Sequence, residues 1–384
     1  MLEENSSHAW ERLLGVACLA SLALILAATL WPFRMAPRNG VALDGSGKGV
    51  RFKSNGIIRS VRDFGGAGDS QSVACSLEMY FQPESTDSLG TMLQFYREDR
   101  HANFVLRQFL DGILIFRNVM DERGRQRQVE VDVDHILSKD KPILVTLTSG
   151  PSGLAAYTNG KLVERHAAQR IPCKNLTGEL FIGTAASEQD GWEGYFLGLA
   201  IYEKELTAAQ VRSNATLWLA GDHDGWDADG VAARYFLVPD ANGRIVNEAG
   251  GGPELEIPAT YNVPHKIFLK PMWEEFNAGR DYVEDLIRNI LGFVPLGIVL
   301  FAYLSIGRNA GSATRIAVII GAVTSLTIEI LQSYIPPRKS GMTDILTNTL
   351  GTAIGAMIAR TAAFQTVLER VRKMFERNWM KRLE

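Results

Sequence analysis

An uninterrupted apolar run lies near the start of the chain. Residues 13–30 carry no charged side chain and are followed by Trp31, Pro32, Phe33 and Arg34. A run of this length can cross the hydrocarbon core of a bilayer, and Trp31 suits the membrane interface. The alternative is a cleaved signal peptide, but the preceding residues are not basic and no small-residue cleavage site closes the run. We therefore predict a retained membrane-spanning helix over residues 13–33.

Three more apolar runs crowd the last third of the chain, at residues 287–306, 316–335 and 345–363. Each contains a few polar residues, which suits helices that pack on one another in a membrane. We predict four spans in total. The distribution of Lys and Arg places the N-terminus (1–12) and the tail (364–384) in the cytoplasm and the long segment between spans one and two outside.

The tail, residues 364–384, has the pattern of an amphipathic helix. Its apolar side chains recur at helical spacing and its basic residues fall on other faces; the apolar set is Phe364, Val367, Leu368, Val371, Phe375 and Trp379. Such a helix can lie on an anionic membrane surface. A solvated helix that only adds to the cytoplasmic positive charge is the alternative, and both interpretations stay open.

The long insert has short alternating runs separated by Gly, Asn, Asp and Pro, which is typical of an antiparallel β-sandwich. The clearest predicted strands are 73–81, 104–109, 112–117, 129–133, 143–148, 154–157, 178–182 and 196–202. Asn159 and Gly160 supply a tight hairpin turn, because both tolerate positive φ. We predict one extracytoplasmic sandwich over residues 40–262.

Composition narrows the class of protein. The 384 residues contain 40 Lys plus Arg and 43 Asp plus Glu, a net charge of −3, which argues against a nucleic-acid-binding protein. The three cysteines, Cys18, Cys75 and Cys173, show no CxxC spacing. This excludes a metal–thiolate site and a disulfide-dense scaffold, and leaves Cys75 with Cys173 as the pair that could form.

Two stretches of the insert carry a family resemblance. Residues 141–165 contain a YxNG hairpin at Tyr157–Gly160, and residues 178–211 contain an LxIG strand followed by a closing strand and helical turn. This order resembles the laminin G-like, or concanavalin A-like, jelly roll. The resemblance implies that fold over about residues 40–258 and a domain that binds glycans, proteins or neither; we expect a glycan or another cell-surface polymer as partner.

Acidic residues in the insert suggest two kinds of chemistry. Glu130, Asp132 and Asp134 approach the carboxylate spacing of jelly-roll glucanases, but the last acid is one methylene short, so an exposed acidic strand is the simpler interpretation. We therefore assign no catalytic residue; whether the protein is an enzyme stays open, and a non-enzymatic role is favoured.

Asp222, Asp224, Asp227 and Asp229 form a glycine-containing acidic loop, a candidate calcium site. Trp226 occupies a ligand position and no Glu closes the loop, which favours a solvated turn. Calcium is the one candidate cofactor. Trp192 and Trp226 are candidates for stacking on sugar rings if they are exposed, and otherwise core residues.

The last third of the chain carries a second resemblance. The segment 285–297 reads D-x-x-x-N-x-x-x-F-x-P-x-G, Glu329 and Gln332 follow as E-x-x-Q, and segment 338–355 holds Arg, Asp, Asn and two glycines at fixed spacing. These motifs, with residues 29–33, resemble the VanZ-like membrane family. The resemblance implies a helical bundle over residues 263–363, interrupted after its first span by the jelly roll, and a link to reduced sensitivity to teicoplanin-type glycopeptides.

The polar motif residues are expected to converge near the outer membrane face: Asp285, Asn289, Glu329, Gln332, Arg338, Asp344 and Asn348. In a structural interpretation, Arg338 pairs with a carboxylate, the amides bond between helices, and Gly351 with Gly355 allows close packing. In a functional one, Arg338 and the amides hold the phosphate of a lipid-linked precursor, with a divalent cation on Asp285, Glu329 and Asp344.

Together these patterns predict a multi-pass protein of the bacterial-type cytoplasmic (inner) membrane. Its partners would be membrane lipid and a cell-surface glycan recognised by the jelly roll, with no nucleic acid. One alternative is a membrane enzyme or carrier that acts on a lipid-phosphate-linked envelope precursor at Asp285, Glu329, Arg338 and Asp344. Another is a scaffold for protein partners.

Overall fold

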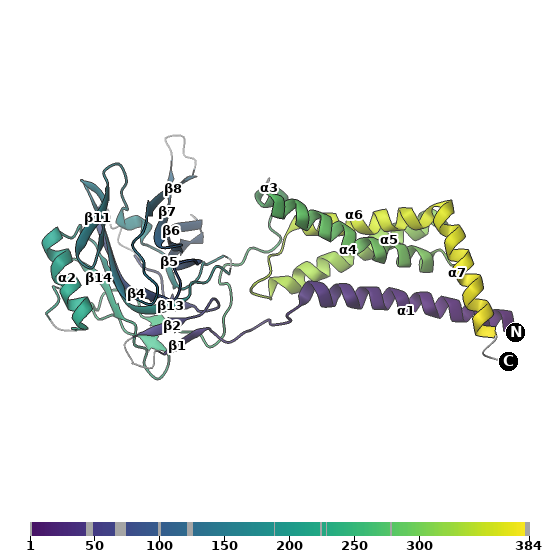
Figure 1. Cartoon of the computed structure of the whole chain (residues 1–384), viewed down its shortest axis with the longest axis horizontal. Coiled ribbons are helices and arrows are strands. Elements are labelled where there is room, and N and C mark those ends of the chain that lie inside the picture. Colours follow the sequence, from purple (N-terminus) through teal and green to yellow (C-terminus); the bar gives the residue numbers. More distant parts are fainter. Residues whose placement is uncertain are drawn as a thin grey trace. The chain divides into compact units, whose positions relative to one another are not determined.

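The computed structural model describes residues 2–43, 49–65, 74–98, 101–120, 126–187, 189–222, 225–227, 229–276 and 279–380. The chain forms two compact units. One unit is helical and combines Met1–Met35 with Ile267–Glu384; the other contains the strands and comprises Ala36–Lys266 (Figure 1). The chain thus leaves the helical unit after its first helix and returns to it 231 residues later, counting Ala36 to Lys266 inclusive.

In its described residues the second unit is an antiparallel sandwich of two eight-stranded sheets. One sheet has the order β1 (Val41–Leu43), β2 (Val50–Phe52), β13 (Gly194–Tyr202), β4 (Cys75–Pro83), β9 (Ile143–Gly150), β10 (Gly153–Thr158) and β11 (Lys161–His166), and β14 (Val231–Phe236) pairs with β13. The other has the order β15 (Arg244–Ile245), β16 (Leu255–Glu256), β3 (Ile58–Ser60), β12 (Glu179–Ile182), β5 (Leu89–Arg97), β6 (His101–Phe109), β7 (Gly112–Met120) and β8 (Gln126–Val133). The predicted antiparallel sandwich is confirmed.

Period-two alternation explains how the sandwich fills its interior. Inward side chains of both sheets form one apolar cluster that includes Phe52, Phe81, Phe95 and Phe196. Cys75 and Cys173 form a disulfide with their Cα atoms 5.2 Å apart, whereas Cys18 is buried and free. The predicted turn between β10 and β11 is present, with φ of 47° at Asn159 and 81° at Gly160.

Helix α2 (Ala208–Ala220) covers the outer face of the first sheet. It begins with a capping box, in which the Thr207 hydroxyl accepts the N–H of Gln210 and the Gln210 side chain accepts the N–H of Thr207. It ends at Gly221, whose φ of 64° is the left-handed conformation that closes many helices. Trp218 and Val211 bury the helix against Tyr202 and Tyr157 of the sheet.

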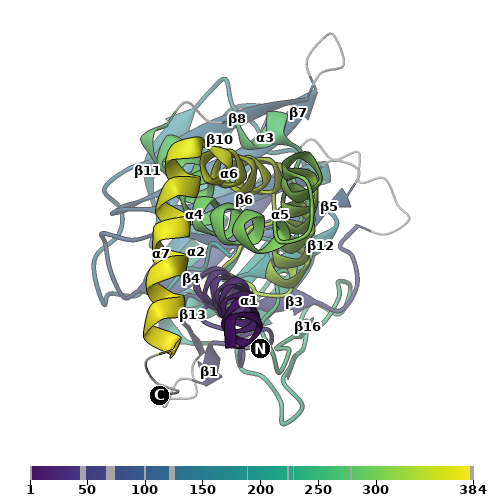
Figure 2. The same ribbon diagram turned by 90° about the vertical axis from the view of Figure 1, so that its right-hand side faces the viewer.

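The helical unit contains α1 (Leu2–Leu30), α3 (Met272–Glu275), α4 (Arg280–Leu304), α5 (Ala310–Ser333), α6 (Met342–Arg360) and α7 (Ala362–Met380). Helices α1, α4, α5 and α6 run side by side, and α7 lies across one end of them (Figure 2). Helices α4 and α6 approach closely at Gly351 and Gly355, where an added β-carbon would strike the carbonyl oxygens of Ile290 and Val294. The small-residue contact predicted for these two glycines is therefore present.

Three helices in the described part of the chain are long and apolar enough to cross a membrane: Ser6–Leu30, Arg280–Leu304 and Ala310–Ser333. Helix α6 forms where the fourth span is predicted, but it is not among the three. Its first two turns carry Thr343, Asp344, Thr347 and Asn348, which lower its hydropathy. A fourth crossing therefore stays a prediction.

Candidate functional site

The polar motif residues lie where α5 ends and α6 begins, beside the first half of α4. Asn289 of α4 donates from Nδ2 to Asp344 Oδ1 of α6 over 2.7 Å. Asn348 of α6 donates from Nδ2 to the Ser325 hydroxyl of α5 over 2.9 Å, while its Oδ1 is buried without a hydrogen-bond partner in the described part of the chain. These bonds join three helices, as the structural interpretation predicts for the amides.

Two carboxylates hold the first turn of α6. Glu329, 1% exposed, accepts the N–H of Gly341 at Oε2 over 2.9 Å. Glu275 of α3 accepts the N–H of Thr343 over 3.0 Å and also the Thr343 hydroxyl. The N–H groups at the start of a helix lack partners within the helix and carry partial positive charge, so these acids stabilise that end of α6.

Two other motif residues bond to the end of α1. Gln332 donates from Nε2 to the Thr29 carbonyl oxygen over 3.0 Å. Arg338 donates from Nη2 to the Trp31 carbonyl oxygen over 2.7 Å. Among the described residues Arg338 forms no ion pair with a carboxylate, the contact that the structural interpretation proposed, and its guanidinium is directed to this backbone oxygen instead. The backbone at the end of α1, at Thr29 and Trp31, is therefore part of the site.

Asp285 does not join the other acids. Its side chain is 68% exposed and accepts a bond from Arg288 on the next turn of α4, over 3.4 Å. Among the described residues no three His, Cys, Asp or Glu side chains gather closely enough to hold a metal ion. The described geometry therefore gives no support to a divalent cation on Asp285, Glu329 and Asp344.

Glu275 was not identified from the sequence. It lies in a four-residue helix, 68 positions before Thr343, and no local spacing links the two. Glu275 comes close to Thr343 because Lys270 pairs with the turn before α6. This pairing consists of the β-bridge to Gly341 and the hydrogen bond from the Lys270 N–H to the Ser340 carbonyl oxygen.

In the sandwich, the stacking role considered for Trp192 is wrong. Trp192 is 1% exposed and packs among Phe52, Phe81 and Phe196, and its Nε1 donates to Gln108 Oε1 over 2.6 Å. Trp192 lies two residues before β13, in the connection from β12, and its side chain points into the core. A buried indole cannot stack on a sugar.

Trp226 is only partly buried and remains a candidate for stacking. Its ring lies 5.0 Å from that of Trp218 and under the Arg234 guanidinium at 4.9 Å. Its Nε1 donates to the Asp222 carbonyl oxygen over 2.9 Å. One face of the loop is therefore ordered by aromatic packing.

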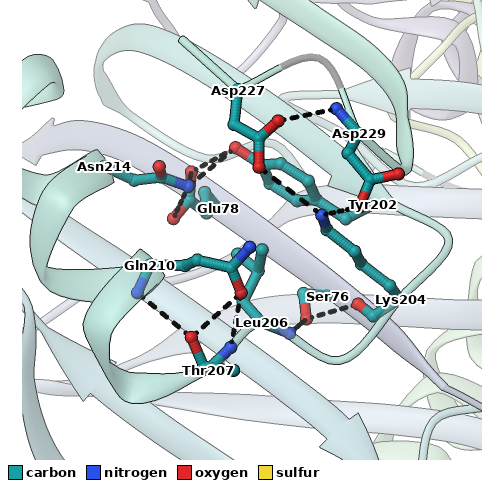
Figure 3. Close-up of polar contacts among 10 residues, drawn as sticks. All are labelled: Ser76, Glu78, Tyr202, Lys204, Leu206, Thr207, Gln210, Asn214, Asp227 and Asp229. Atoms are coloured by element: carbon teal, nitrogen blue, oxygen red, sulfur yellow. Dashed lines mark hydrogen bonds and ion pairs between the residues drawn. The ribbon is translucent and has the colours of Figure 1, made fainter.

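The acidic loop is partly neutralised by a lysine. Lys204 Nζ lies 2.7 Å from Asp229 Oδ2 and 3.7 Å from Asp227 Oδ2 (Figure 3). The N–H of Asp229 donates to Asp227 Oδ1 and, with Lys204 adding to the effect, holds the pKa of Asp227 below its usual value. Asp224 lies outside the described residues. The described acids thus resemble the solvated turn that the sequence favours.

A buried carboxylate beneath α2, Glu78, was not predicted from the sequence. Glu78 of β4 is 0% exposed and accepts hydrogen bonds from Tyr202 Oη at 2.8 Å and Asn214 Nδ2 at 3.2 Å (Figure 3). It also accepts a hydrogen bond from Trp218 Nε1 at 3.0 Å. The Thr146 hydroxyl donates a fourth, longer bond. Burial raises the pKa of Glu78, and the four donors oppose that shift.

A cleft of about 500 Å³ opens at one side of the sandwich. It is lined by both basic and acidic side chains, by backbone of residues 251–253 and by the Cys75–Cys173 disulfide; its charged residues include Arg62, Asp63, Lys174 and Glu203. A concave surface with several polar groups around a rigid disulfide can hold a hydroxyl-rich ligand.

Two family matches cover these two regions. Residues 243–364 match the family described as VanZ/LLP1, and residues 62–212 match the Concanavalin A-like lectin/glucanases superfamily. The chain thus combines a segment that matches the VanZ/LLP1 family with a segment that matches the concanavalin A-like superfamily, the combination that the sequence predicts. The VanZ/LLP1 match begins inside the sandwich unit, so it includes β15 and β16 as well as the helices.

No curated protein matches the chain. Among solved structures it is similar to a Bacteroides ovatus ATCC 8483 protein assigned as carbohydrate-binding, at 15% identity and a TM-score of 0.36, over 54% of this chain and 59% of that one. It is also similar to a heptameric SAP-like pentraxin from Limulus polyphemus, at 13% identity and a TM-score of 0.30, over 52% and 88%. The chain thus spans about three fifths of the length of the first of these. The fold assignment rests on the family match and the sheet order.

Proposed function

We propose that this protein is a multi-pass protein of a bacterial-type cytoplasmic membrane whose sandwich lies outside the cell membrane and binds a glycan or another cell-surface polymer. The observation that carries the proposal is a concanavalin A-like sandwich with a polar, disulfide-bordered cleft. The Cys75–Cys173 disulfide supports the outer location, because such bonds persist in oxidising compartments. Arg308, between α4 and α5, and Arg315, near the start of α5, favour a cytoplasmic position for that end of the bundle.

The test is a binding screen of the full-length protein in lipid nanodiscs against cell-wall and capsular polysaccharides. We expect at least one polymer to bind, and Lys174→Ala together with Arg62→Ala to weaken that binding at least about tenfold, since hydrogen bonds to charged groups contribute about 1.5–3 kcal/mol. Lys161→Ala with Lys141→Ala removes the same charge from exposed positions away from the cleft and serves as the matched control.

A chelator arm tests calcium. Because Lys204 neutralises Asp227 and Asp229, we expect the chelator to leave binding unchanged. Loss of binding on chelation would support the calcium interpretation of the loop. If the protein binds no polymer under either condition, the glycan proposal is abandoned.

A second candidate function concerns the helical unit. Glu275, Glu329 and Asp344 surround the first turn of α6, and Arg338 lies on the turn just before it. In the described part of the chain these three acids form no ion pair with Arg338, whose guanidinium bonds the Trp31 carbonyl oxygen. Acids without such a pair favour a functional role, here action on a lipid-phosphate-linked envelope precursor. The resemblance to VanZ-like proteins makes teicoplanin sensitivity the phenotype to measure. We expect Asp344→Asn to abolish any protection at unchanged membrane abundance; unchanged protection would remove this candidate.

A further inference from the structure

Helix α7 has two apolar faces, and within the described part of the chain only one of them packs against other helices. Leu368 and Phe375 pack toward Trp10, Leu14 and Ala302, and the rings of Trp10 and Phe375 are 5.6 Å apart. The second face presents Val367, Val371 and Met374, which are 54%, 41% and 54% exposed. These three residues, spaced i, i+4 and i+7, form one stripe on the helix, which we call the exposed stripe.

The charges of α7 are arranged asymmetrically around the exposed stripe. At 3.6 residues per turn, Arg370 and Arg377 fall along one border of the stripe and Lys373 lies further round on the same side, and all three are exposed. Glu369 and Glu376 fall on the opposite side of the helix. Arg372 also lies away from the stripe, where it pairs with Glu376 over 2.7 Å and reaches the Ser7 hydroxyl. The stripe therefore has a positive border and its acids face away.

The position of α7 at the end of the helical bundle indicates what the exposed stripe contacts. The helix follows α6 directly, after an extended residue at Thr361, and lies across the end of the bundle beside the N-terminal part of α1 (Figure 2). The same end of the bundle carries Arg308 and Arg315. Since α1, α4 and α5 are long and apolar enough to cross a membrane, a helix transverse to their ends lies at the level of the lipid headgroups.

We propose that α7 docks on an anionic lipid surface, with Val367, Val371 and Met374 inserted below the headgroups and Arg370, Lys373 and Arg377 against lipid phosphates. The apolar stripe supplies burial and the cations supply attraction to the negative leaflet. A second copy of the chain fits this surface poorly. A two-fold contact through the same stripe brings equivalent faces together, so the three cations of each copy would lie close to those of the other.

The test uses full-length protein in which Val371→Cys carries an environment-sensitive fluorophore. Cys18 is buried and the remaining cysteines are disulfide-bonded, so the engineered thiol is the accessible one among the described residues. The protein is placed in nanodiscs of phosphatidylcholine alone or of phosphatidylcholine with phosphatidylglycerol, one copy in each disc. Glu369→Cys carries the same fluorophore on the opposite side of α7.

We expect blue-shifted emission and quenching by brominated acyl chains at position 371, both stronger with phosphatidylglycerol, and water-like emission at position 369. The substitutions Arg370→Gln, Lys373→Gln and Arg377→Gln should remove the dependence on phosphatidylglycerol, because each cation strengthens docking about fivefold. As the matched control, Lys139→Gln, Lys141→Gln and Lys161→Gln remove equal charge from the sandwich and should change nothing.

Two results would overturn the proposal. Water-like emission at position 371 in both lipids would show a solvated helix. A blue shift that appears only when two copies share a disc, and that ignores phosphatidylglycerol, would show a contact between copies instead.

Discussion

The two units solve the problem of a buried carboxylate in different ways. Glu78 in the sandwich is surrounded by side-chain donors that all come from the surrounding sheet and α2. Glu329 in the helical unit accepts a backbone N–H at the start of α6, with a second acid, Asp344, close enough to repel it. One acid is matched by donors, and the other stands among like charges.

The difference indicates two roles: Glu78 anchors α2 on the sheet, whereas the helical unit holds one acid more than its hydrogen bonds at the start of α6 require. A carboxylate that accepts hydrogen bonds from Tyr202, Asn214 and Trp218 fixes α2 on the sheet, and each donor would be left buried and unpaired without it. In the helical unit, Glu275 and Glu329 already satisfy N–H groups at the start of α6, so the charge of Asp344 is not needed for capping. Asp344 is only half-buried, and an ionisable side chain withdrawn even partly from water inside a membrane bundle is costly and is typical of functional sites.

The largest effect is expected for Glu78→Ala. The change opens a cavity and leaves three strong donors without an acceptor, so we expect a loss of about 3–5 kcal/mol in the stability of the sandwich. Hydrogen exchange of amides in β13 and α2 measures it without requiring a two-state transition of the whole chain. Glu130→Ala, at an exposed position of β8, should change the same amides by less than about 0.5 kcal/mol. Equal effects of the two substitutions would refute the anchor interpretation.

An intermediate effect distinguishes the two acids directly. Glu78→Gln replaces an acceptor oxygen with an amide NH₂ that faces N–H and O–H donors, which should cost about 1.5–3 kcal/mol. Glu329→Gln keeps an oxygen for the Gly341 N–H and removes the repulsion from Asp344, so the helical unit should change by less than about 1 kcal/mol. Hydrogen exchange in the first turn of α6 gives the second value. A larger cost for Glu329→Gln would reverse the comparison.

The smallest effect is a dependence on pH. Burial raises the pKa of Glu78 in the folded protein above the ordinary value of 4.5, so the folded state holds a proton that the unfolded chain has lost. The contribution of Glu78 to the free energy of unfolding is therefore complete below pH 4.5. It is lost as the pH rises from 4.5 through the raised pKa, by about 1.4 kcal/mol for each unit of the shift. Glu78→Gln should remove this component from the pH profile of β13 exchange. Identical slopes in the two proteins would contradict it.

The sequence predicted most of the features that a short-range repeat of residue types encodes. Alternation identified the strands around Tyr157 and Phe196, and the glycine spacing predicted close packing at Gly351, although not that α4 is the helix it packs against. It did not predict Glu78 as a buried residue, because a polar residue on the outer face of a strand indicates solvent unless a helix is known to cover it. Likewise, the Arg338 contact joins residues 307 positions apart, and spacing cannot indicate which backbone oxygen a guanidinium will reach.

The β-bridge between Arg38 and Thr260, extended by the bond from Asn39 to Ala259, holds the two ends of the sandwich together. The helical unit holds its own two ends together as well, because Trp31 contacts Arg338 and Lys270 contacts Gly341, on the same turn. A long insertion with adjoining ends therefore adds sequence but little chain-closure entropy to its host. The bundle could gain, lose or exchange such a domain during evolution without redesign of its own packing.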